Sequence, residues 1–475
     1  MASPGHSSKG SESDSETGGR FRFVSMQAPD EPKDQMARRR ARSHAVKQAL
    51  QDKRRLQQNS SDHFRVVGLQ DGTLRVIGKR AQARATPMPF FCRLSAGVLD
   101  PFHSLAVDSS RLQAFLSDYR TRQAPEPVFS VTKELGFQSF RSVFRTGLVD
   151  AALICAVMLS LAFEAAGGDI NGECLRYRGR AIGHVRERMD SPGEATSEST
   201  IGAILLLAGV EARLGMTSQV QLHMGAVRLL LDLCRTKGIY LTGGIKRAIF
   251  WQDLNSSILA GSSRIVDHTT FSELQWSRDP FSPSFFQLPP RFQLCAGLLM
   301  KEFTDVLEDL HALQCIRNLS TPTNCDSMMM AHINNHTASI QSRLMSLQDL
   351  SPAMSCCRLA AYLCSVMLCC KVWCALVIPS HVSLQLLQAL QQAGDDSVWD
   401  DHPDLLTWVL FIGGAFAPYG MVRSNYSVLL RSKHASSVEG RYGSWLELLN
   451  ILKGFIWSDR AFMPQVKVFW EEVFT

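Results

Sequence analysis

The chain has 475 residues, of which 45% are hydrophobic, and its formal net charge at pH 7 is +6. This length can bury a large core in one or two domains, and the composition is that of an ordinary water-soluble protein. The longest apolar run, residues 151–162, is too short for a bilayer and is bracketed by Asp150 and Glu164. We therefore expect no membrane-spanning segment and no membrane partner.

The positive charge is concentrated in the N-terminal arm. Residues 1–91 hold 17 Lys or Arg and 9 Asp or Glu, which gives +8, whereas the remaining residues hold 33 and 35, which gives −2. Residues 1–35 are rich in Ser, Gly and acidic residues, so they are predicted to form a disordered tail. This tail lacks the apolar core of a secretory signal, and no export is predicted.

The most basic stretch of the chain is residues 36–58, which contain eight Lys or Arg and a single Asp. Between Arg38 and Gln57 there is no Pro or Gly, and the residue types present favour one continuous helix. Its apolar seam is thin, so we expect the helix to become stable only on a partner. The candidate site residues are its cations: Arg38, Arg39, Arg40, Arg42, Lys47, Lys53, Arg54 and Arg55.

Three interpretations fit this basic segment. Its two clusters, residues 39–40 and 53–55, are separated by twelve residues, a spacing typical of a bipartite nuclear import signal. The same side chains suit nonspecific contact with DNA phosphates through counterion release. The third interpretation is a solvated basic linker, because runs of charge often serve only to keep a chain in water.

Residues 59–90 are predicted to form a linker, in which two β-branched runs around Asp71 and Gly72 indicate a β-hairpin. From residue 91 onward, nearly every segment shows helical periodicity and breaks at Gly or Pro. The sequence therefore predicts an all-α domain over residues 91–475, a large multi-helix array. The expected helices are residues 109–119, 137–144, 148–166, 174–189, 197–214, 219–236, 245–259, 292–313, 324–347, 353–377, 382–393, 403–416, 422–432 and 443–457.

Two of these segments, residues 148–166 and 353–377, are apolar on nearly every side, so we expect them at the centre of the domain. The 13 cysteines all lie at or after Cys92, and six of them fall in the second apolar segment. Without a CxxC motif, they suit small hydrophobic packing better than metal or redox chemistry. Their odd number indicates reduced thiols in an intracellular protein.

Catalytic and metal-binding signatures are weak. His332 and His336 lie one helical turn apart, a spacing that suits a shared metal, but no HExxH motif accompanies them. Ser130 and Lys133 fit the SxxK pattern of serine acyl enzymes without the other motifs of that class. No GxSxG, GxGxxG or Walker sequence occurs. We predict no catalytic residue, no metal site and no cofactor, and an unrecognised all-α enzyme is the least favoured alternative.

Several landmarks follow one another along the helical region. They are residues 223–226 (HMGA), 237–238 (KG), 251–253 (WQD), 405–414 (LLTWVLFIGG), Arg423, Tyr426, 454–457 (GFIW) and 470–472 (WEE). In this order they resemble the fungal-specific transcription factor domain, a helical regulatory region that in many members follows a six-cysteine binuclear zinc cluster. The resemblance covers residues 110–475 and implies a domain that binds effectors or partner proteins.

The arm is similar to a subset of that family in which an aromatic motif, here Phe21-x-Phe23-Val24, and a basic RSH segment, here residues 42–47, precede the helical region. A binuclear zinc cluster needs six cysteines in a compact N-terminal run, because its two zinc ions share thiolate ligands. This chain has no cysteine before Cys92. Sequence-specific DNA reading by such a module is therefore excluded.

Taken together, the residues and the resemblance predict a nuclear, transcription-regulator-like protein. In this interpretation the basic arm binds an import receptor and contacts DNA phosphates nonspecifically. The helical domain binds effectors, other transcription regulators or a second copy of the chain. The alternative is an interaction module or co-regulator that never touches DNA and acts through the helical domain.

Overall fold

The computed structural model describes residues 105–118, 150–279, 281–319, 327–368, 377–394, 396–436 and 444–474. Contacts divide the chain into residues 1–88 and residues 89–475, and every described residue belongs to the second unit. All regular secondary structure in the described ranges is helical, which confirms the all-α fold class. The predicted tail, basic helix, hairpin and helix over residues 137–144 lie outside the described residues.

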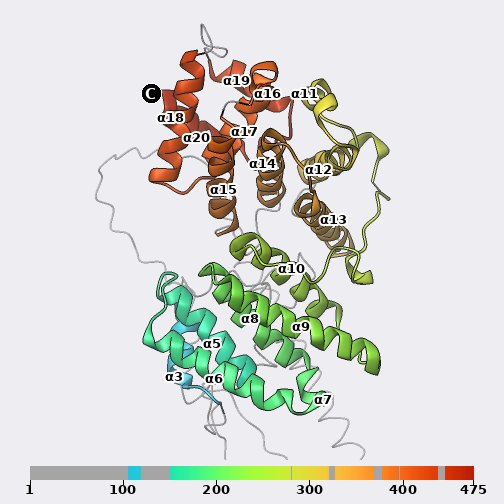
Figure 1. Cartoon of the computed structure of the whole chain (residues 1–475), viewed down its shortest axis with the longest axis vertical. Helices are drawn as coiled ribbons and strands as arrows, with labels where there is room; N and C mark the ends of the chain where they lie inside the picture. The colour runs from blue at the N-terminus through green and yellow to red at the C-terminus, as the bar shows by residue number, and fades with distance from the viewer. Residues whose placement is uncertain are drawn as a thin grey trace, which may run out of the picture. The chain divides into compact units, whose positions relative to one another are not determined.

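A first group of helices is built on α5 and α8 (Figure 1). Helix α5 contacts α3, α6 and α8, while α8 also contacts α9 and α10. Every residue of α5 from Ala152 to Phe163 is buried, which confirms that this apolar segment is central. The bounds are α3 Ser109–Ser117, α5 Ala151–Ala165, α6 Gly172–Met189, α7 Pro192–Ala195, α8 Glu198–Arg213, α9 Thr217–Lys237 and α10 Gly243–Ala260.

A second group surrounds α14, which contacts α12, α13, α15 and α17. Helix α10 of the first group contacts α15 of the second, and this contact joins the two groups. The bounds are η4 Ser272–Leu274, η5 Pro283–Phe285, α11 Pro290–Leu294, η6 Ala296–Leu298, α12 Lys301–Leu319, α13 Ser327–Ser346, α14 Pro352–Leu368, α15 Ile378–Gln392, α16 Val398–Asp401, α17 Pro403–Ala415, α18 Met421–Ser436, α19 Trp445–Lys453 and α20 Met463–Phe474.

Two expectations about the helices were wrong. The single helix expected over residues 292–313 is divided into α11, η6 and α12, because the backbone becomes extended at Leu299 after a 3₁₀ turn. Helix α20 was not expected at all. Its buried side chains Val466, Phe469 and Val473 lie three and four residues apart, the spacing of one helical face, so the signal was present in the sequence.

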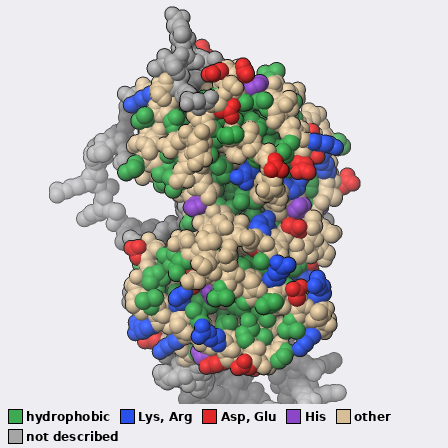
Figure 2. All heavy atoms as spheres, in the orientation of Figure 1, with side chains coloured by type: hydrophobic (Ala, Val, Ile, Leu, Met, Phe, Trp, Pro, Cys, Tyr) green, Lys and Arg blue, Asp and Glu red, His purple; other side chains and the backbone are tan. Residues whose placement is uncertain are grey.

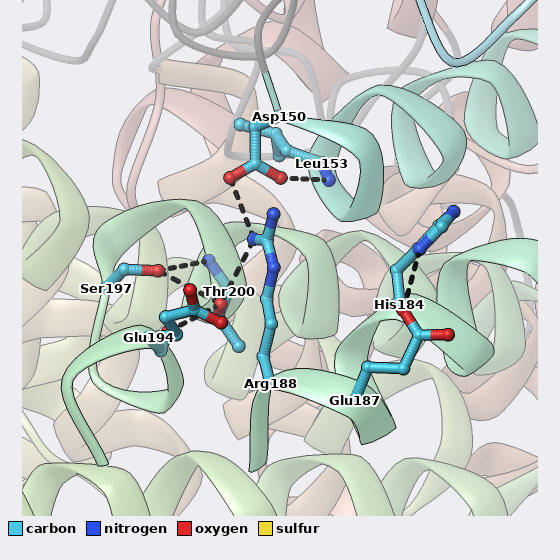
Figure 3. A network of polar contacts seen from close by, with 8 residues as sticks. All are labelled: Asp150, Leu153, His184, Glu187, Arg188, Glu194, Ser197 and Thr200. Atoms are coloured by element: carbon cyan, nitrogen blue, oxygen red, sulfur yellow. Dashed lines mark hydrogen bonds and ion pairs between the residues drawn. The ribbon is translucent and has the colours of Figure 1, made fainter. Parts of the chain in front are cut away.

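Polar side chains fix the beginnings of α5 and α8 (Figure 3). The carboxylate of Asp150 accepts a hydrogen bond from the backbone N–H of Leu153 at 2.9 Å, and the Ser197 hydroxyl accepts one from the N–H of Thr200 at 3.2 Å. Both are N-caps. From the last turn of α6, Arg188 donates to the Asp150 carboxylate at 2.7 Å and to the Thr200 hydroxyl at 3.3 Å. The guanidinium of Arg188 thus links the last turn of α6 to the N-termini of α5 and α8.

Candidate functional site

The sites predicted from sequence fall into two sets. The eight cations of the basic segment, residues 36–58, lie outside the described residues, as do Ser130 and Lys133 of the SxxK pattern. Their roles stay predictions. The structure describes both His332 and His336, and it describes the cysteine-rich segment as far as Leu368.

The described cysteines are all free thiols. Cys356, Cys357 and Cys364 are buried on α14. Burial raises the pKa of the Cys356 thiol to about 12 and those of the other two well above the usual value. Because the thiolate is the reactive form, these side chains are inert at neutral pH and act as small apolar packing groups.

The two histidine rings of α13 have separate surroundings. His336 is fully buried and stacks on Trp276, with ring centroids 3.9 Å apart and an interplanar angle of 3°. Burial lowers the pKa of His336 well below its usual range, so the ring is neutral at pH 7. His332 instead places Nε2 2.8 Å from the carbonyl oxygen of Asp279. Within the described part of the chain, no three His, Cys, Asp or Glu side chains are grouped as metal ligands.

A pocket of about 260 Å³ lies between α10, α13, α14 and α15, where the two helix groups meet. Its floor consists of buried side chains, namely Ile258, Leu359, Tyr362 and Val382. Its rim consists of half-buried side chains, namely Ser257, Met345, Arg358 and Gln385. The pocket therefore combines an apolar interior with a polar, partly exposed edge, which is the usual make-up of a small-molecule site.

Arg358 is the only charged residue of α14. Its Nε atom is buried without a hydrogen-bond partner, and none of the described carboxylates forms an ion pair with its guanidinium. Desolvation lowers the pKa of Arg358, but an arginine stays charged at any physiological pH. The pocket therefore contains a permanent, partly desolvated positive charge without a counter-charge among the described residues.

Two other polar side chains of the pocket, those of Tyr362 and Gln385, are held by their neighbours. The Tyr362 hydroxyl donates to the Gln341 side-chain oxygen at 3.2 Å. The Gln385 amide donates to the carbonyl oxygen of Ile258 at 3.4 Å and lies 3.1 Å from Nε2 of His381. Burial lowers the pKa of His381, so this ring adds no second charge at pH 7. These contacts preorganise the rim around a single cation.

Such an arrangement can bind an anion that has an apolar body. The described lining contains no carboxylate, cysteine or histidine. Arg358 was not among the site residues predicted from the sequence. The available signal was one charge in the middle of an otherwise apolar helix, a position where charges are rare without a purpose or a partner.

The surface of the helical body does not concentrate positive charge on the face shown in Figure 2. There, Lys and Arg side chains are interspersed with Asp, Glu and apolar side chains. A stripe of cations is the usual footprint of nucleic-acid binding. The face in view lacks such a stripe (Figure 2).

The landmarks of the resemblance are packing and hydrogen-bonding positions. Asp253 accepts hydrogen bonds from the backbone N–H groups of Ile265 at 3.0 Å and Val266 at 3.3 Å. The Trp408 indole donates to the carbonyl oxygen of Ile456 at 3.2 Å. These residues connect segments that are far apart in the sequence, and their role in the described structure is to hold the fold.

Comparisons of the chain with protein-family models, with curated proteins and with solved structures returned no match. The resemblance to the fungal-specific transcription factor domain therefore stays a prediction, supported by the order of the landmarks. None of the described helices is both long and apolar enough to cross a membrane.

Proposed function

We propose that this chain is a nuclear, transcription-regulator-like protein, with a basic arm for import and a helical body that binds a small effector. The observation that carries the proposal is the placement of charge. Eight cations gather in residues 36–58, in two clusters with bipartite spacing, whereas residues 92–475 carry a net charge of −2. A segment so different from the rest of the chain is suited to a task of its own.

The pocket between α10, α13, α14 and α15 supports the effector-binding part of the proposal. It has an apolar floor, a polar rim and a cation that forms no ion pair with a described carboxylate. It also lies where the first and second helix groups touch, so an occupant would contact helices of both groups. A ligand at such a position can change the relative stability of two arrangements of the body, which is the requirement for regulation.

Nuclear import is tested by changing Lys53, Arg54 and Arg55 together to Ala in a fluorescent fusion of the full chain. We expect the fusion to move from the nucleus to the cytoplasm, because the second cluster of the signal is removed. The matched control changes three arm cations outside the clusters, namely Arg20, Arg22 and Lys33. Unchanged nuclear accumulation of the cluster variant would reject the import role.

Phosphate contact is tested with the full chain and duplex DNA over a salt series. If about five arm cations neutralise phosphates, log affinity should fall with log salt concentration at a slope of about −4.5. Sequence changes in the DNA should leave the affinity unchanged, because phosphate contacts carry no base information. A flat salt series would remove DNA from the proposal.

The alternative, an interaction module that never touches DNA, is favoured by one surface feature. Leu222 and Leu229 lie seven residues apart on α9 and are 70% and 71% exposed. Two helical turns separate them, so they lie on the same face of the helix. If this face docks a protein partner or a second copy, changing both residues to Glu should abolish self-association in sedimentation experiments or co-purification of the partner. Retained association would exclude this face.

A further inference from the structure

The proposed function leaves open which chemical class of effector the helical body recognises. The pocket itself restricts the answer through its charge, its lining residues and its volume. The inference below rests on the proposed function only in calling the ligand an effector. The binding chemistry follows from the pocket.

The charge of the pocket selects for an anion. Removing a guanidinium from water without a counter-charge is unfavourable, and this cost is reduced when an anion occupies the site. The Nε atom of Arg358 is buried without a hydrogen-bond partner. None of the described carboxylates forms an ion pair with its guanidinium. Planar guanidinium groups bind carboxylates with two parallel hydrogen bonds. Arg358 is the one charged group among the described lining residues, so a monoanion matches it better than a multiply charged phosphate.

The floor selects for hydrocarbon. Ile258, Leu359 and Val382 present aliphatic side chains, and Tyr362 presents an aromatic ring whose hydroxyl is already bonded to Gln341. An inorganic anion would leave these apolar surfaces in contact with water. A ligand with a hydrocarbon body would cover them and gain hydrophobic free energy in proportion to the area buried.

The volume limits the size of the ligand. A cavity of about 150 Å³ holds benzene, which has six carbon atoms. By proportion, the 260 Å³ of this pocket suits a ligand of roughly ten non-hydrogen atoms. Branched aliphatic acids and short arylalkanoic acids fall in this range, whereas nucleotides, long-chain fatty acids and peptides are larger.

We propose that the pocket between α10, α13, α14 and α15 binds a small organic monocarboxylate, with the carboxylate on Arg358 and the hydrocarbon body on Ile258, Leu359 and Val382. Ile258 comes from α10, whereas Leu359 and Val382 come from α14 and α15. The ligand therefore bridges the two helix groups at their contact. Its binding stabilises that contact.

The test is titration calorimetry on the full chain with two probes, 4-methylpentanoate and 3-phenylpropanoate. Their primary amides have nearly the same shape without the charge. We expect the carboxylates to bind and the amides to bind at least tenfold more weakly. Arg358→Gln should weaken carboxylate binding by about 30-fold, the lower end of the loss expected when one partner of a desolvated charge pair is removed. Arg358→Lys should recover part of the affinity.

The matched control is Arg228→Gln, which removes an exposed arginine of α9 that is not part of the pocket lining. It should leave probe binding unchanged. Circular dichroism and thermal melting show whether each variant folds. If Arg358→Gln is misfolded, Ile258→Trp replaces it, because a larger side chain on the floor should block both probes.

The inference would be overturned if the amides bound with the same affinity as the carboxylates, if a folded Arg358→Gln variant kept the full affinity, or if neither carboxylate bound at millimolar concentration. Competition by inorganic phosphate at equal concentration would assign the site to a simple anion and would also overturn it. Carboxylate binding by a chain that stays in the cytoplasm would retain this inference and reject the nuclear function. Nuclear import of a chain that binds neither probe would retain the nuclear function and reject this inference.

Discussion

Two arginines of the second helix group occupy opposite kinds of environment. Arg423 on α18 uses its donors on neighbouring groups: Nε and Nη2 donate to the Glu472 carboxylate at 2.5 and 3.1 Å, and Nη1 donates to the carbonyl oxygens of Gly414 at 3.2 Å and Ala415 at 3.0 Å. Arg358 on α14 has neither a described carboxylate beside it nor a partner for its buried Nε.

The packing around the two side chains differs in the same way. Arg423 lies where α17, α18 and α20 meet, with its guanidinium carbon 4.9 Å from the ring centroid of Tyr419 and 5.0 Å from that of Phe469. Arg358 lies beside a pocket of about 260 Å³. A charge that donates to several neighbouring acceptors holds the fold together, whereas a charge beside a pocket and without a described partner is available to a ligand.

The largest effect on stability is expected at Arg423. Arg423→Met should lower the free energy of unfolding by about 3 kcal/mol, because it leaves the Glu472 carboxylate and two helix carbonyl groups without their donor. Urea denaturation measures the change. Arg228→Met, at an exposed position of α9, is the control and should stay within about 0.5 kcal/mol of the unmodified protein. Equal effects of the two variants would contradict the structural role.

The contact of α17 with α18 and α20 should be destabilised by a single added methyl group. A Cβ at Gly414 would overlap the Phe469 ring, and a Cβ at Gly413 would lie 2.5 Å from the Tyr426 hydroxyl. Gly414→Ala should therefore destabilise the protein by about 2 kcal/mol, even after the better helix propensity of Ala is counted.

Gly225 on α9 is the matched control, since a Cβ there meets nothing within 4 Å. Gly225→Ala should stabilise the protein by up to about 1 kcal/mol. Thermal melting of both variants gives the comparison. Shifts of the same sign in the two variants would show that close packing at α17 is not the reason for its paired glycines.

His336 allows the energetic cost of burying a charge to be distinguished from that of burying a neutral polar ring. His336 is fully buried, and burial lowers its pKa, so it avoids the penalty by staying neutral, which an arginine cannot do. Below pH 6.5 the unfolded chain binds a proton at this residue and the folded chain does not, so stability is complete above that pH and falls as the pH is lowered.

His336→Phe, which keeps a ring against Trp276, should therefore flatten the dependence of stability on pH between 6.5 and 5. The expected difference is at most about 1.4 kcal/mol per pH unit. Urea denaturation at several pH values measures it. The other titrating groups are present in both proteins, so most of their contribution cancels in the difference; His332, which interacts electrostatically with His336, is the main exception. Parallel curves for the two proteins would show that His336 is protonated equally in both states.

The smallest effect has the opposite sign. In the absence of ligand, Arg358→Met should raise the free energy of unfolding by about 1 kcal/mol, because a partly desolvated charge without a described counter-charge is replaced by an apolar group. Thermal melting detects the shift. With 4-methylpentanoate present, the unmodified protein should gain stability and the variant should not. Destabilisation by this substitution would assign Arg358 a structural role like that of Arg423.

Much of the fold was predictable from the sequence, because helices depend on local periodicity. The segment 148–166 is apolar all round, and α5 is indeed buried from Ala152 to Phe163. The break between α11 and α12 was missed because the apolar pattern continues through it, while the extended backbone at Leu299 depends on what packs there. Helix α20 was missed although its buried face has regular spacing.

Less of the candidate site than of the fold could be predicted from the sequence. The sequence by itself determined the segregation of charge into residues 36–58 and the presence of one arginine in an apolar helix, because both are properties of residue order. Only the tertiary structure decided that Arg358 lacks a described partner while Arg423 has several, and that Ile258, Leu359 and Val382 face one pocket. Pairing and cavities depend on which helices meet, and those contacts join residues far apart in the chain.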